Sequence, residues 1–99
     1  MPKENLIAIH DFCFNHNIEI SFISSLQQTG LLEITTLDEA MFIDTNQLPQ
    51  LERYIRFYYE LDINLEGIET IIHLLQQINS MNEEIISLRN RLYFYETNE

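Results

Sequence analysis

Two histidines and a cysteine follow one another at a spacing that can bind a metal ion. His10, Cys13 and His16 form an H-x2-C-x2-H run, and imidazole and thiolate are the ligands that zinc prefers. On a helix their side chains would point in directions that span about 120°, and no fourth ligand lies nearby in the sequence. We therefore expect no metal site and no cofactor. Cys13 is predicted to be a small core residue and His16 a turn residue.

Acidic pairs are the other candidates for chemistry, because two neighbouring carboxyl groups can act as a general acid and a general base. The pairs are Asp38-Glu39, Glu66 with Glu69, and Glu83-Glu84. No recognisable pocket motif or phosphate-binding loop accompanies them, so we expect these carboxylates to be solvated surface groups. The chain is therefore not expected to be an enzyme.

The charge balance is strongly acidic. Sixteen Asp and Glu residues against five Lys and Arg give a formal net charge of −11, and no Lys or Arg lies between Glu4 and Glu52. Such a surface repels nucleic-acid phosphates and attracts basic protein surfaces. We therefore expect this part of the chain to bind protein and not nucleic acid.

The composition predicts one small domain made mainly of helices. Hydrophobic residues make up 45% of the 99 residues, too many for a disordered chain, and glycine and proline occur only twice each. The single cysteine excludes an intrachain disulfide and fits a reducing compartment. No apolar run has the length of a membrane span or the pattern of a signal peptide, so we expect a cytoplasmic protein without membrane contact.

Residues 65–95 carry the strongest pattern in the chain, because apolar side chains recur there at alternating steps of three and four residues. This spacing keeps one narrow seam on one side of a helix, as in a coiled coil. Ser80 and Glu83 could form a capping box that restarts the helix at 79–82, but the heptad phase crosses Ser80 unbroken, which favours one continuous helix. At about 45 Å it would exceed the width of a 99-residue domain, so we predict that its end pairs with another chain in a homodimer. The predicted dimer contacts are Ile78, Met81, Ile85, Leu88, Leu92 and Tyr95.

The first third of the chain predicts a helix-turn-helix. Residues 5–9 could form a short strand, and 10–16 and 20–28 two helices with their aromatic and aliphatic side chains on one face. Gly30 stands where the second helix should end, because glycine takes the left-handed C-cap conformation without strain.

A small hairpin, or wing, and a connecting helix should follow. Residues 32–35 and 40–43 are rich in strand formers and flank a turn at 36–39. The next helix is predicted over 48–61, and residues 62–64 break the chain before the long helix, with Asn64 as its cap. The expected core face of this connecting helix consists of Leu51, Tyr54, Ile55, Tyr58 and Leu61.

These elements suggest two parts within one compact domain. Residues 1–62 would form a winged helix-turn-helix-like domain with its connecting helix, and residues 63–99 the long dimerisation helix.

The order of elements and three stretches of sequence resemble the chaperone modulatory protein CbpM family, a branch of the MerR-type winged helix-turn-helix superfamily. The resemblance covers about residues 5–95. The stretches are Phe12-Cys13, Gly30-Leu31-Leu32-Glu33, and the eight residues LDINLEGI from Leu61 to Ile68.

The resemblance implies a mainly α fold, a MerR-like winged helix-turn-helix with a small β hairpin wing and a long C-terminal coiled-coil dimerisation helix. It also implies a chaperone modulator that binds the J-domain of a DnaJ/CbpA-type co-chaperone and inhibits it. MerR-type relatives suggest that the two long helices pair antiparallel.

The chain departs from DNA-binding members of this superfamily in the second helix. In those regulators an Arg-Tyr-Tyr-Glu run ends the helix and contacts phosphates and bases, whereas here Ser24, Ser25, Leu26 and Gln27 take its place. Because phosphate contacts supply most of the affinity of such proteins, we expect no DNA binding by this face.

For the J-domain contact we predict the acidic residues around the break between the last two helices, together with a neighbouring tyrosine. An aromatic residue beside the break, Phe57 or Tyr59, either is buried in the dimer or anchors a partner. Two other functions stay open, a MerR-type DNA-binding transcription regulator and another acidic interaction protein such as an anti-repressor. The predicted partner-binding residues are Tyr59, Glu60, Asp62, Glu66 and Glu69.

Overall fold

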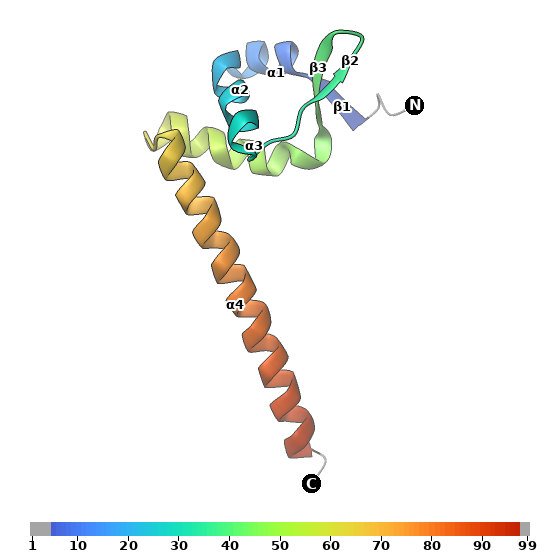
Figure 1. Cartoon of the computed structure of the whole chain (residues 1–99), viewed down its shortest axis with the longest axis vertical. Helices are drawn as coiled ribbons and strands as arrows, with labels where there is room; N and C mark the ends of the chain where they lie inside the picture. The colour runs from blue at the N-terminus through green and yellow to red at the C-terminus, as the bar shows by residue number, and fades with distance from the viewer. Residues whose placement is uncertain (1–4, 98–99) are drawn as a thin grey trace. The chain divides into compact units, whose positions relative to one another are not determined.

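The computed structural model describes residues 5–97, which form two compact units divided between Glu69 and Thr70. The chain is mainly helical, with a small three-stranded antiparallel sheet and a long C-terminal helix, as the sequence predicts (Figure 1). Unit 1 holds every element before the long helix and the first residues of that helix, and unit 2 holds the rest of it. The outer ends of the two predicted parts, residues 1–4 and 98–99, lie outside the described residues.

Helices α1 (Ile9–His16) and α2 (Ile20–Thr29) confirm the predicted helix-turn-helix. Asn17 turns the chain between them in the left-handed conformation, at φ 60°. Gly30 ends α2 at φ 86°, where its N–H donates to the carbonyl oxygens of Leu26 and Gln27. The apolar side chains of both helices enter the core of unit 1 as expected, and the buried ones are Ile9, Phe12, Cys13, Phe22, Ile23 and Leu26.

The sheet consists of β1 (Leu6–Ala8), β2 (Thr35–Leu37) and β3 (Ala40–Asp44), in the order β1-β3-β2. The strand predicted at 32–35 is therefore wrong in position, because β2 starts three residues later. The backbone of Glu33 bonds instead to the side chain of Gln47, its N–H donating over 2.9 Å and its carbonyl accepting over 2.7 Å. These bonds use the groups that a strand ladder would need.

The turn of the hairpin is also shorter than predicted. Thr36 pairs with Met41, and Leu37 pairs with Ala40, so only Asp38 and Glu39 connect the two strands. Both connecting residues have positive φ, 51° and 67°, which is the backbone of a two-residue turn that suits the twist of a hairpin. Aspartate tolerates this conformation, and both side chains are exposed.

The connecting helix has two parts, α3 (Leu48–Ile55) and a π-helical segment, η3 (Arg56–Glu60). Leu51 and Tyr54 are buried as predicted, but Tyr58 and Leu61 are 37% and 58% exposed, so the predicted core face is wrong there. The N–H of Leu61 donates to the carbonyl of Arg56, five residues earlier, over 3.1 Å. A turn that closes over five residues takes the following side chains out of the 3.6-residue phase.

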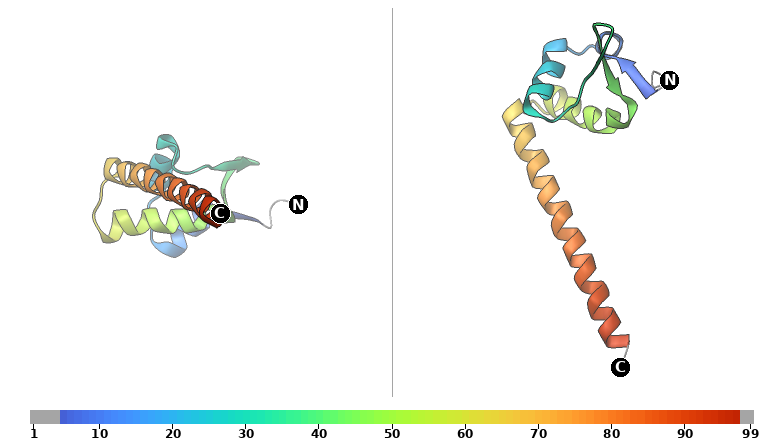
Figure 2. Two further views of the ribbon diagram at one scale, coloured as in Figure 1. Left: turned by 90° about the horizontal axis from the view of Figure 1, so that it is seen from below. Right: turned by 45° about the vertical axis from the view of Figure 1, so that its right-hand side comes forward.

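Helix α4 (Leu65–Thr97) is 33 residues long and runs without interruption, as predicted (Figure 2). Its length corresponds to about 50 Å. Ile68 and Ile72 are buried, whereas every described residue after Ile72 is exposed. Among residues 5–97, no helix has both the length and the apolarity to cross a membrane.

A hydrogen bond from Tyr54 joins α3 to the loop after α2. Its ring is buried, and its hydroxyl donates to the carbonyl oxygen of Leu31 over 3.0 Å. Burial raises the pKa of this hydroxyl, and the nearby Arg53 guanidinium lowers it by less. The folded state therefore keeps the Tyr54 proton at a pH where the unfolded chain releases it.

Replacing Tyr54 tests this contact. Tyr54→Phe should lower the free energy of unfolding by about 1 kcal/mol at pH 7, because the Leu31 carbonyl loses its donor. Wild-type stability should fall as the pH rises above about 10, where only the unfolded chain is deprotonated, so the deficit of the variant should shrink there. Urea unfolding at fixed protein concentration measures both effects. Tyr93→Phe, at an exposed tyrosine, is the control, and an equal loss in both variants would contradict the account.

Candidate protein-binding surfaces

The face that a helix-turn-helix protein uses for DNA has no cation here. Helix α2 and the β2–β3 hairpin lie within the stretch between Glu4 and Glu52, which contains no Lys or Arg. At the end of α2, Leu26 is fully buried, Ser24 and Ser25 are half-buried, and Gln27 is exposed. This end of the helix therefore offers neutral polar groups and no charge that could pair with a phosphate.

The predicted partner-binding residues surround the turn that joins η3 to α4. Asp62 adopts the left-handed conformation at φ 57°, and the N–H of Ile63 donates to the carbonyl of Phe57 over 2.9 Å. Asn64 caps α4 as predicted, its Oδ1 accepting the N–H of Gly67 over 2.8 Å. These bonds fix the path of the chain between the two helices.

We call the five side chains around this turn the acidic corner: Tyr59, Glu60, Asp62, Glu66 and Glu69. All five belong to unit 1 and are exposed, as a partner surface requires. Glu66 and Glu69 lie three residues apart at the start of α4, so they share one side of the helix.

Tyr59 is held in place although its ring is exposed. Its hydroxyl accepts the backbone N–H of Glu19 over 3.2 Å. Phe22 stacks on Tyr58 at a centroid distance of 4.4 Å and meets Tyr59 edge to face at 5.4 Å. A fixed aromatic ring loses little conformational entropy on binding, so Tyr59 has the properties of an anchor.

Glu19 is a member of this surface that sequence reasoning missed. The hydrogen bond to Tyr59 places its backbone beside the acidic corner, and its side chain is exposed. Forty residues separate the two positions, and no periodicity or motif in the sequence connects them. A shallow depression beside Tyr58 and Tyr59 is further lined by Asp62, Ile63 and Asn64.

The three residues of the H-x2-C-x2-H run on α1 do not form a metal site in the described structure. The Nδ1 atom of His16 lies 3.1 Å from the carbonyl oxygen of Phe12, and its ring stacks on the Phe12 ring at 4.2 Å. Cys13 is buried, and burial raises the pKa of its thiol. Nowhere in residues 5–97 do three His, Cys, Asp or Glu side chains come together in a way that could hold a metal ion.

Phe14 is a second exposed aromatic that sequence reasoning did not single out. It lies on α1 and is 86% exposed, beside a depression that His10, Ile18 and Ile20 help to line. The neighbouring Phe12 and Cys13 are buried, so the helical phase of α1 alone turns Phe14 to solvent.

The seam of α4 is exposed along its whole second half. The six predicted dimer contacts, Ile78 to Tyr95, are between 45% and 65% exposed. Such a continuous apolar row on an isolated helix is unusual for a surface that faces only water.

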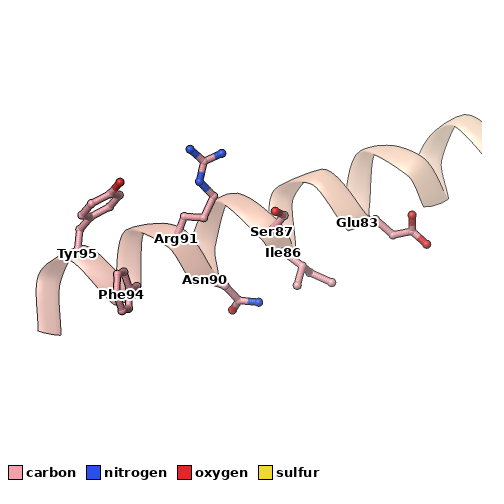
Figure 3. Close-up of a pocket in the computed structure, with 7 residues that line it drawn as sticks. All are labelled: Glu83, Ile86, Ser87, Asn90, Arg91, Phe94 and Tyr95. Atoms are coloured by element: carbon pink, nitrogen blue, oxygen red, sulfur yellow. The ribbon is translucent and has the colours of Figure 1, made fainter. Parts of the chain in front are cut away.

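A second group of apolar side chains lies off the seam near the end of α4. Ile86 and Phe94 line a shallow depression with Asn90, at steps of four residues. Figure 3 shows Asn90 and Phe94 on one side of the helix and Arg91 and Tyr95 on the other. Apolar side chains therefore leave α4 in more than one direction at this end.

Comparison with protein-family models finds a match over most of the chain. The family model described as MerR HTH family regulatory protein matches residues 7–90. No curated protein and no solved structure matches the chain.

Replacing Gly67 with alanine tests how closely the turn at 62–64 packs against the start of α4. A Cβ atom at this position would lie 2.7 Å from Cγ2 of Ile63 and 3.2 Å from Oδ1 of Asn64. Gly67→Ala should therefore lower the free energy of unfolding by about 1 kcal/mol, although alanine is the better helix former.

The matched control is Ser80→Ala, at an exposed position in the middle of α4, which should stabilise by about 0.5 kcal/mol. Urea unfolding of both variants makes the comparison. An increase in stability for Gly67→Ala as large as that for Ser80→Ala would show that the corner tolerates the methyl group.

Proposed function

The chain belongs to the family of MerR HTH regulatory proteins, and within it we propose a regulator that binds protein and not DNA. The proposed partner is the J-domain of a DnaJ/CbpA-type co-chaperone, which the chain would inhibit as a modulator of the CbpM kind. The resemblance described above, including the stretch from Leu61 to Ile68, supports this choice of partner.

One observation carries the proposal, the absence of Lys and Arg between Glu4 and Glu52. Proteins that bind DNA gain most of their affinity from cations that neutralise phosphates. Here the helix and hairpin that would face the duplex bear only neutral and acidic side chains, so DNA would be repelled. A helix-turn-helix protein whose second helix and hairpin carry no Lys or Arg is therefore expected to bind a partner other than DNA.

The acidic corner suits a basic helix. A J-domain usually presents such a helix beside its His-Pro-Asp loop, and charge complementarity would guide the encounter. Tyr59 would anchor the contact, since its ring is exposed and its hydroxyl is bonded to the backbone of Glu19. By covering the basic helix, the modulator would keep the co-chaperone from its Hsp70 partner. This is a binding function without catalysis, and it would operate in the cytoplasm.

The homodimer is part of the proposal. Residues 73–97 of α4 are all exposed, and they include the six apolar side chains of the seam. At about 25 cal/mol per Å² of apolar area, covering this seam would stabilise the protein substantially. A second copy of α4 is the partner that we propose for it.

A DNA-binding transcription regulator is the alternative function. The family membership favours it, and the lack of cations on α2 and the hairpin opposes it. Tight binding of duplex DNA with a strong salt dependence would favour the alternative. Another acidic interaction protein, such as an anti-repressor, would bind a different basic partner and leave the J-domain untouched.

The acidic corner can be tested by reversing two of its charges. Glu66→Lys/Glu69→Lys should weaken binding to the isolated J-domain about tenfold or more and reduce the salt dependence of binding, because both acids face the proposed basic helix. Isothermal titration calorimetry measures the affinity.

The matched control is Glu33→Lys/Glu52→Lys, which changes the net charge equally at two exposed positions that are not members of the acidic corner. Equal weakening by both double variants would show that only the overall charge matters. An unchanged affinity of Glu66→Lys/Glu69→Lys would remove these residues from the site.

The dimer can be tested at the centre of the seam. Leu88→Asp places a charge among apolar side chains, so the protein should become a monomer in sedimentation experiments at concentrations where the wild type is dimeric. Gln76→Asp, at an exposed position off the seam, is the control and should stay dimeric. A Leu88→Asp variant that remains a dimer would place the interface elsewhere.

A further inference from the structure

The shallow depression beside Tyr58 and Tyr59 combines two aromatic rings with a carboxylate and an aliphatic side chain. Asp62, Ile63 and Asn64 complete its lining. Its volume of about 370 Å³ is at the small end of the range for ligand sites, so it suits a single side chain better than a larger ligand.

We propose that this depression binds one guanidinium group, that of an arginine on the basic helix of the partner. The identity of the partner rests on the proposed function. The inference adds the chemistry of one contact, and it assigns a role to Tyr58, which the sequence placed in the core.

The π-helical segment η3 brings Tyr58 to the depression. Regular helical periodicity predicts Tyr58 on the core face, but the turn closed by the Leu61 N–H and the Arg56 carbonyl spans five residues. Tyr58 and Tyr59 are consequently 37% and 39% exposed. Two successive tyrosine rings are therefore both partly open to a ligand.

The two rings meet nearly at right angles, and each is fixed by another residue of unit 1. Their planes are inclined at 79°, with the centroids 5.0 Å apart. Phe22 stacks on one face of Tyr58 at 4.4 Å, and the Tyr59 hydroxyl accepts the Glu19 N–H over 3.2 Å. Phe22 does not line the depression, so the part of the Tyr58 ring that does lies away from Phe22. Rings fixed before binding lose little conformational entropy when a ligand arrives.

The chemistry of the lining favours a guanidinium. An aromatic face attracts a cation, and arginine is the cation found there most often. The Asp62 carboxylate can accept two N–H groups from one guanidinium, and the half-buried Ile63 offers apolar surface to the methylene stem. A lysine ammonium is a compact charge that neither stacks flat on a ring nor donates two parallel bonds.

The charges around the depression also suit a cation from another molecule. Among residues 5–97, no Lys or Arg lines it. The remaining acidic side chains of the acidic corner surround the same turn, and their negative potential would draw a basic group towards the depression.

A titration with N-acetyl-arginine amide tests the site without a protein partner. NMR follows the ring and backbone signals of Tyr58 and Tyr59 in the whole chain. These signals should shift and saturate at a dissociation constant of roughly 1–10 mM, because one side chain makes few contacts. N-acetyl-citrulline amide has the same shape without the charge and should bind about tenfold more weakly. N-acetyl-lysine amide should also bind more weakly than the arginine compound.

Variants of the lining locate the bound amide. Asp62→Asn should weaken binding of the arginine amide about fivefold, because the guanidinium loses its charged acceptor. Asp38→Asn is the matched control, since Asp38 is also exposed and left-handed, at φ 51°, but lies in the hairpin turn, and it should bind like wild type.

The Tyr58 ring is tested by a second pair of variants. Tyr58→Phe keeps the aromatic face and should retain binding, whereas Tyr58→Leu should lose most of it. Tyr93→Leu, at an exposed tyrosine of α4, is the control and should bind like wild type. Far-UV circular dichroism checks that each variant is folded.

Calorimetry with the isolated J-domain tests where the arginine comes from. Asp62→Asn should weaken J-domain binding about tenfold, and Asp38→Asn, with the same net charge, should weaken it much less. An unchanged J-domain affinity of Asp62→Asn would overturn the partner's arginine as the occupant.

The two titrations separate failure of the site from failure of the proposed function. No shift with the arginine amide, or equal binding of the citrulline or lysine compound, would overturn the guanidinium site and leave the proposed J-domain function standing. A J-domain that does not bind the wild type would refute the proposed function and the source of the arginine. The amide titration would then decide the guanidinium site alone.

Discussion

Helix α4 presents a row of apolar side chains that the other residues in 5–97 leave exposed, and the rest of the account depends on this constraint. One third of the 99 residues belong to a single helix, and burial along it ends at Ile72. A helix of this length with an open seam would fray in water, since isolated helices are marginally stable. The small core of unit 1 holds the start of α4 through Ile68, and the proposed second copy would hold the remainder.

Negative charge determines what the helix-turn-helix and hairpin of this chain can bind. The helix-turn-helix and the hairpin are formed as in a DNA-binding domain, yet the side chains that would meet phosphates are serine, glutamine, aspartate and glutamate. A fold alone does not specify its ligand, because the ligand is chosen by the surface groups that the fold presents. The proposed J-domain contact follows from this excess of negative charge.

The sequence predicted the helices of this protein because their signals are local. The turn at Asn17, the cap at Gly30, the break at 62–64 and the continuity of α4 can each be read from neighbouring residues. The position of β2 could not, because it depends on hydrogen bonds between Glu33 and the distant Gln47. The π-helical segment was missed for a different reason, since helical periodicity assumes 3.6 residues per turn throughout. For this reason Tyr58 and Leu61 were wrongly predicted to lie on the core face.

The candidate site was largely predictable because it is almost contiguous. The residues from Tyr59 to Glu69 surround one turn, so a cluster of charge in the sequence became a cluster in space. The contribution of Glu19 could not be foreseen, because a single hydrogen bond from its backbone to Tyr59 joins segments forty residues apart. Phe14 likewise depends on the phase of a short helix, which the sequence defines only approximately.

The most direct test of the account is a titration of the unaltered protein against the isolated J-domain of its host's DnaJ-like co-chaperone, and against a DNA duplex, at low and at physiological salt. The account predicts binding to the J-domain that weakens as salt is added, and no binding to the duplex at either salt concentration. Binding to DNA, or no binding to the J-domain even at low salt, would contradict it.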